Sequence, residues 1–183
     1  KKILVEEKVE EEQYDLSKWA FQGKGKAAVT FPGETIPEIF LNACKELGSK
    51  PAFADARSGI LTYSRLKLAT CLLAEKFRKM PGKYIGILLP ASAGAFICVL
   101  ACHLAGKIPL MINWTIGTRH LQAVKSLSHV EVVLTSWAFL ERLDTVDLEG
   151  IDDRLVMLET VRREATLFDK IRALIRSKKS TKS

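Results

Sequence analysis

Residues 84–114 (YIGILLPASAGAFICVLACHLAGKIPLMINW) constrain the fold more than any other stretch of the chain. Two short aliphatic runs flank a stretch of small residues and cysteines, and no acidic or basic residue other than a histidine lies between Lys83 and Lys107. Pro90 ends the first run, Ser92 is placed to cap a following helix, and Gly106 is placed to end that helix. The pattern predicts a strand–helix–strand crossover in a parallel sheet that is buried on both faces.

A membrane span is the alternative interpretation of the same stretch. A transmembrane helix needs about 20 predominantly apolar residues, and the interval between the two lysines is long enough. We favour the crossover because proline and glycine divide the interval into segments shorter than a span. A single-span membrane protein remains the weaker alternative, and solubility without detergent would exclude it.

Helices and aliphatic strands alternate along the rest of the chain. Thr35 and Glu38 form a capping box that opens the first helix, and Thr62 caps the second, with Leu66 and Phe77 on its buried side and Glu75 facing outward. The predicted helices cover residues 35–47, 62–77, 117–128 and 136–142. In the third of these, Leu121, Val124 and Leu127 recur at helical spacing. The remaining predicted strands cover residues 51–55, 60–62, 130–135 and 154–158. This order predicts an α/β fold, a parallel sheet with helices on both faces, with residues 51–62 as a separate hairpin.

Charge and composition divide the chain into three parts. We expect residues 1–30 to be an extension or linker, 31–177 an α/β subdomain, and 178–183 a basic tail. The net charge is +7, of which +6 lies in residues 162–183, so the folded part carries little net charge and nucleic acid is not an expected partner. Thr166–Ser177 predicts a basic amphipathic helix, which we expect to dock on the domain; peripheral contact with an anionic membrane is the alternative.

The residues carry no self-contained catalytic site. Cys44, Cys71, Cys98 and Cys102 lie in apolar helical patterns, which favours buried thiols in a reducing compartment over disulfides. Cys98, Cys102 and His103 are too few for a zinc site, so no metal is expected. No nucleophile elbow, HExxH motif or paired-carboxylate pattern is present, and because residues 1–13 are charged throughout we do not expect them to be a signal peptide.

Several short motifs, taken in order, resemble the N-terminal part of the adenylate-forming (AMP-binding) superfamily. Residues 61–66 (LTYSRL) are similar to the opening core motif of that superfamily, with Arg65 in place of its glutamate, and residues 104–110 (LAGKIPL) are similar to the second. Residues 113–115, 135–140 (TSWAFL), 158–162 (LETVR) and 166–175 narrow the resemblance to the 2-acylglycerophosphoethanolamine acyltransferase/acyl-acyl-carrier-protein synthetase branch. The resemblance covers residues 31–177.

The resemblance implies an ATP- and Mg²⁺-dependent ligase. Such an enzyme makes an acyl-adenylate from a long-chain fatty acid and passes the acyl group to acyl carrier protein or CoA. It would serve phospholipid reacylation in the cytoplasm, at the inner face of the cytoplasmic membrane. The family's phosphate loop and catalytic lysine lie beyond the matched part. We therefore expect a fragment that is inactive alone, has no catalytic residue of its own and holds neither ATP nor Mg²⁺.

Asn113 and Trp114 are the candidate substrate-pocket residues, because they follow a predicted strand at the end where open α/β sheets bind ligands. An ordinary loop is the alternative for both residues. A non-catalytic α/β binding or scaffold domain is the alternative for the whole chain. A parallel sheet separated from a larger enzyme exposes apolar surface, so self-association is also expected.

Overall fold

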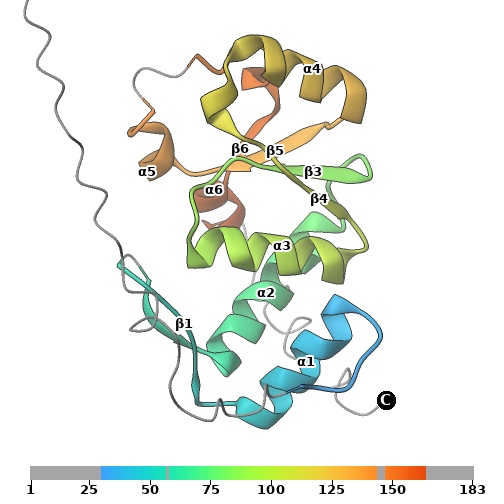
Figure 1. The fold of residues 1–183 in the computed structure, drawn as a ribbon, viewed down its shortest axis with the longest axis vertical. Coiled ribbons are helices and arrows are strands. Elements are labelled where there is room, and N and C mark those ends of the chain that lie inside the picture. The colour runs from blue at the N-terminus through green and yellow to red at the C-terminus, as the bar shows by residue number, and fades with distance from the viewer. Residues whose placement is uncertain (1–29, 57, 144–146, 164–183) are drawn as a thin grey trace, which may run out of the picture. The chain divides into compact units, whose positions relative to one another are not determined.

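The computed structural model describes residues 30–56, 58–143 and 147–163 (Figure 1). Apart from Thr30, these residues belong to one unit, Phe31–Ser183. The predicted linker before Thr30, the amphipathic segment Thr166–Ser177 and the basic tail 178–183 lie outside the described residues.

The predicted crossover forms the centre of the fold. Strand β3 (Tyr84–Ile87) leads into helix α3 (Ala93–Ala105) and then into strand β4 (Ile108–Met111), which pairs with β3 in parallel. The Ser92 hydroxyl caps the helix by accepting from the Ala95 N–H at 3.2 Å, and Gly106 ends the helix at φ 72°. The prediction from the sequence is confirmed. Among the described residues, no helix has the length and apolar character needed to cross a bilayer.

Four parallel strands form the main sheet in the order β4-β3-β5-β6. Strand β5 covers Val132–Thr135 and β6 covers Leu155–Met157, each within the range predicted for it. Between the strands lie η2 (Trp114–Ile116), α4 (Thr118–Ser128), α5 (Trp137–Leu140) and η3 (Asp152–Arg154), and α6 (Leu158–Arg163) follows β6.

Helices cover both faces of this sheet, as predicted (Figure 1). Helices α2 (Tyr63–Phe77) and α3 pack on one face, where Ile85 and Leu134 of the sheet meet Phe77 and Cys98. Helices α4 and α5 pack on the other face, against Leu88, Ile112 and Val133; the helical residues in this core include Leu121 and Phe139. Alternation along the strands therefore produces two separate cores.

A third, smaller core joins α1 (Ile36–Leu47) to α2 and α3 through residues that include Phe40, Leu66 and Leu100. Both bonds of the predicted capping box at Thr35 and Glu38 are present. Strands β1 (Pro51–Asp55) and β2 (Gly59–Thr62) form the predicted antiparallel hairpin.

The burial of two side chains, Glu75 and Leu127, differs from what helical spacing in the sequence predicts. Glu75 was predicted to face outward, but it is 5% exposed and its carboxylate lies 2.6 Å from the Arg78 guanidinium. Arg78 also donates to the Leu104 carbonyl at 2.6 Å, so the pair links α2 to the end of α3. Leu127 is 83% exposed, whereas Leu121 is fully buried, because six residues of an α-helix rotate a side chain to another face.

Strand β4 is an edge of the described sheet. The N–H groups of Ile108 and Ile112 donate inward, to carbonyls of Lys83 and Ile87. The backbone N–H and C=O groups of the intervening odd-numbered residues therefore point away from β3, toward the open edge of the sheet. Pro109 occupies one of those positions and has no N–H to donate. The Ile108 and Met111 side chains are exposed along this edge.

Lys107 fastens the turn before β3 to the end of α3. Its ammonium donates to the carbonyls of Met80 at 2.7 Å and Gly82 at 2.6 Å. We expect Lys107→Met to lower the free energy of unfolding by about 2 kcal/mol, because two charge-assisted bonds are lost and two carbonyls are left without this donor. Urea unfolding would measure the change. Lys83→Met, at an exposed lysine, is the matched control, and an equal effect of the two variants would contradict this assignment.

Candidate functional site

The strand order places a topological switch point between β3 and β5. From β3 the chain moves outward to β4, and it then returns past β3 to β5. The helix after β3 packs on one face of the sheet, and Phe139, in the helix after β5, packs on the other. Open α/β sheets bind ligands in the crevice where loops diverge in this way, beyond the carboxyl ends of the strands.

Asn113 and Trp114 lie at this edge of the sheet, after β4, which is one strand away from the switch point. The Asn113 side-chain oxygen accepts from the Thr115 N–H at 3.0 Å and from its hydroxyl at 2.8 Å, which fixes a tight turn. Trp114 is half-buried and meets Phe139 edge-on, with ring centroids 4.7 Å apart. Trp114 therefore covers the core under α4 and α5, and a substrate contact by either residue stays a prediction.

The loop after β3 is held by the β1–β2 hairpin. The Asp55 carboxylate accepts from the Ala93 N–H at 2.8 Å, and Phe53 stacks on Phe96 with ring centroids 5.7 Å apart. The Ser92 hydroxyl accepts from the Ala95 N–H, as described above. A carboxylate and a hydroxyl thus occupy two of the first three N–H donors of α3, and the carboxylate would repel a nucleotide phosphate, so this helix start does not fit one.

Residues after β5 and β6 complete the carboxyl edge. Thr135, the last residue of β5, is fully buried, and its hydroxyl has no hydrogen-bond partner among the described residues. Trp137, which opens α5, is 55% exposed, and its backbone N–H donates to the Glu159 carboxylate at 3.4 Å. Neither Thr135 nor Trp137 was identified as a site residue from the sequence. The sequence contains both at the end of a predicted strand, but the strand order that makes this strand central is a long-range property.

The cysteines are buried thiols. Burial raises the pKa of Cys98 to about 12, with a further contribution from the neighbouring Cys102. Burial also raises the pKa of Cys102 to about 12, against the opposing effect of Lys107. Within the described part of the chain, no group of three or more histidine, cysteine, aspartate or glutamate side chains is placed to hold a metal ion.

Stability should fall at alkaline pH because of these thiols. Their pKa values in the folded state lie above the ordinary value, so above about pH 9 the unfolded chain loses protons that the folded chain retains. We expect the free energy of unfolding to drop by roughly 1 to 3 kcal/mol between pH 8 and pH 10. Denaturant unfolding at both pH values measures the drop. Cys98→Ala should reduce the pH dependence, and an unchanged slope in that variant would contradict the thiol origin.

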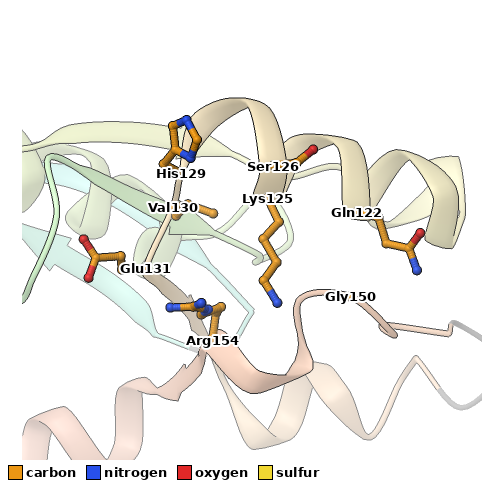
Figure 2. A pocket seen from close by; sticks show the side chains of 8 residues that line it. All are labelled: Gln122, Lys125, Ser126, His129, Val130, Glu131, Gly150 and Arg154. Atoms are coloured by element: carbon orange, nitrogen blue, oxygen red, sulfur yellow. The ribbon is translucent and has the colours of Figure 1, made fainter.

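A separate hollow of about 570 Å³ opens at the opposite, amino-terminal edge of the sheet (Figure 2). Its lining comes from α4, the segment between α4 and β5, and the segment before β6: Gln122, Lys125, Ser126, His129, Val130, Glu131, Gly150 and Arg154. Lys125 and Arg154 both pair with Asp153, at 2.7 and 3.1 Å. Because both cations share this counterion and the hollow lies away from the switch point, we place the candidate site at the carboxyl edge instead.

Comparison with known proteins agrees with the α/β fold described above. A family model described as AMP-binding enzyme matches residues 40–181. A benzoate CoA ligase from Burkholderia xenovorans LB400 is 18% identical with a TM-score of 0.56, covering 71% of this chain and 28% of that one. The O-succinylbenzoate coenzyme A synthetase MenE from Bacillus subtilis, solved in complex with AMP, is 18% identical with a TM-score of 0.57, covering 69% and 32%.

The N-terminal subdomain of NpsA from Klebsiella oxytoca has the same architecture. It is 17% identical with a TM-score of 0.57, covering 72% of this chain and 33% of that one. The chain therefore spans about a third or less of the length of these three solved structures. At such identities the likeness concerns the fold, which is that of the N-terminal subdomain of adenylate-forming enzymes.

Proposed function

The chain belongs to the AMP-binding enzyme family, and we propose that it is the N-terminal part of an ATP-dependent ligase that activates a long-chain fatty acid. In the proposed reaction a carboxylate oxygen attacks the α-phosphorus of ATP, forming an acyl-adenylate and releasing pyrophosphate. A thiol then attacks the acyl carbonyl carbon, loses its proton, forms a thioester and releases AMP. The family match over residues 40–181 is the observation that carries the proposal.

The finer parts of the proposal rest on the sequence motifs. The order of the motifs at residues 113–115, 135–140 and 158–162 favours the branch that uses acyl carrier protein, or CoA, and reacylates phospholipid. We place this activity in the cytoplasm, in association with the inner face of the cytoplasmic membrane, for which Thr166–Ser177 is the alternative to a helix docked on the domain. That segment is outside the described residues.

The described residues supply a wall of the active-site cleft. The carboxyl edge of the sheet presents the loops after β3, β4 and β5, held by the Asp55 and Asn113 hydrogen bonds. Since the Asp55 carboxylate and the Ser92 hydroxyl occupy two of the first three donors of α3, and no metal-binding group occurs in the described ranges, the ATP phosphates and Mg²⁺ would be held by other parts of the enzyme. The chain alone should be inactive.

Carboxylate-dependent ATP–pyrophosphate exchange on the whole protein tests the function. Exchange should be strong with long-chain fatty acids and weak with benzoate, and the isolated 183-residue chain should show none. Acyl transfer to acyl carrier protein or to CoA then identifies the acceptor. Absence of exchange with every carboxylic acid would overturn the proposal and favour a non-catalytic role. Exchange with aryl acids only would retain the ligase and reject the fatty-acid assignment.

Self-association of the chain is tested separately by size exclusion with light scattering. Exposed apolar side chains at Ile108, Met111 and Trp137 support the expectation that copies associate at high concentration. A clean monomer across the concentration range would reject it.

A further inference from the structure

Two features mark the end of β5, a buried hydroxyl and an exposed aromatic ring. The Thr135 hydroxyl is fully buried and has no partner among the described residues, although Val132, Val133 and Leu134 before it are aliphatic. A buried hydroxyl without a partner destabilises a fold, and a valine of the same shape would avoid this loss. Two residues later, Trp137 leaves 55% of its surface exposed.

The position of these residues gives the two features a common explanation. Strand β5 pairs with β3 on one side and β6 on the other, so its carboxyl end borders the switch point. By alternation from Val133, Thr135 lies on the sheet face that carries α4 and α5. Trp137 opens α5, which Figure 1 shows at one end of the sheet. A residue with a large exposed aromatic surface and one with an unsatisfied hydroxyl thus lie two positions apart at the strand end where a ligand is expected.

We propose that the end of β5 binds the carboxylic acid substrate, with Trp137 as a specificity-determining residue and Thr135 as a positioning residue. This inference rests on the proposed ligase function and names the part of the chain that contacts the acyl group and discriminates between acids. The Trp137 ring packs on the apolar part of the acid, which favours long alkyl chains over small acids because more apolar area is removed from water. The Thr135 hydroxyl gains its hydrogen bond in the substrate-loaded enzyme and fixes the segment that carries Trp137.

Two substitutions with matched controls test the proposal in the whole enzyme. Trp137→Ala should raise KM for a long-chain acid about tenfold, with KM for ATP unchanged. Leu127→Ala is its control, because Leu127 is 83% exposed on α4. Thr135→Val should lower kcat/KM for the acid severalfold while making the protein more resistant to urea. Thr70→Val is its control, because Thr70 is equally buried and also without a partner among the described residues, but lies in α2.

The outcomes separate this inference from the proposed function. If the wild-type enzyme performs exchange while Trp137→Ala and Thr135→Val leave the kinetics for the acid unchanged, the inference is wrong and the ligase function stands. If Thr70→Val lowers kcat/KM as much as Thr135→Val, the effect is general to the fold and the positioning role is rejected. If Trp137→Ala changes KM for ATP and for the acid equally, the residue does not read the acyl group. If the wild type activates no acid, both proposals fall together.

Discussion

Gly86→Val should lower the free energy of unfolding by at least about 3 kcal/mol, because Gly86 lies where the central strand has no room for a side chain. A Cβ at this position would be 2.8 Å from the Ile112 Cδ1 and 2.9 Å from the Val133 Cγ2. The Val133 Cα, a backbone atom, would be 3.3 Å away, so side-chain rotation cannot relieve the crowding. Strand propensity alone predicts that the substitution raises the free energy of unfolding, since valine is favoured over glycine in a strand. Urea unfolding therefore discriminates between the two effects.

Gly94→Ala is the matched control for that substitution. Gly94 lies in the first turn of α3, where an added Cβ meets the Ser92 hydroxyl oxygen at an ordinary 3.7 Å. We expect a gain of up to about 1 kcal/mol, because alanine loses less conformational entropy in a helix. A Gly86→Val protein as stable as the wild type would show that the packing around β3 differs from that described.

Arg78→Met should destabilise the chain by about 3 kcal/mol. The substitution removes the guanidinium partner, at 2.6 Å, of the buried Glu75 carboxylate, and it also removes the bond to the Leu104 carbonyl. The figure is at the low end for a broken buried pair because the Arg78 side chain is 33% exposed and solvent screens it. Thermal or urea unfolding provides the measurement.

A double-mutant cycle separates the pair from simple loss of packing. Glu75→Gln combined with Arg78→Met should be less destabilising than the sum of the two single variants, because no charged carboxylate is then left in a buried position. Additive effects would contradict a direct coupling between the two side chains. Arg65→Met, at an exposed arginine of the same helix, should change stability by less than about 0.5 kcal/mol.

Local chemistry explains why much of the fold could be predicted from the sequence. Pro90, Ser92 and Gly106 act on their immediate neighbours, and the boundaries of α3 follow from them. The Thr35 capping box likewise fixes the start of α1 within four residues. Strand β5 begins two residues later than predicted, because Val130 and Glu131 precede the ladder although their pattern matches a strand.

Long-range partners explain the rest. The local sequence predicts that Glu75 is a surface residue. In the fold Arg78 contacts both the Glu75 carboxylate and the Leu104 carbonyl, and Leu104 is 26 residues from Arg78 along the chain. The candidate site depends on strand order in the same way. The sequence indicates that Asn113 follows a strand, but only the order β4-β3-β5-β6 shows that the strand ending at Thr135 borders the switch point.

The outward position of Pro109 affects how two molecules can meet. A strand from another copy, laid along the outer side of β4, would lack one rung of its hydrogen-bond ladder at Pro109. Continuous sheet extension across molecules, the geometry of fibres, is thereby interrupted at this side. Contact there is left to the Ile108 and Met111 side chains, so association through this surface should be reversible on dilution.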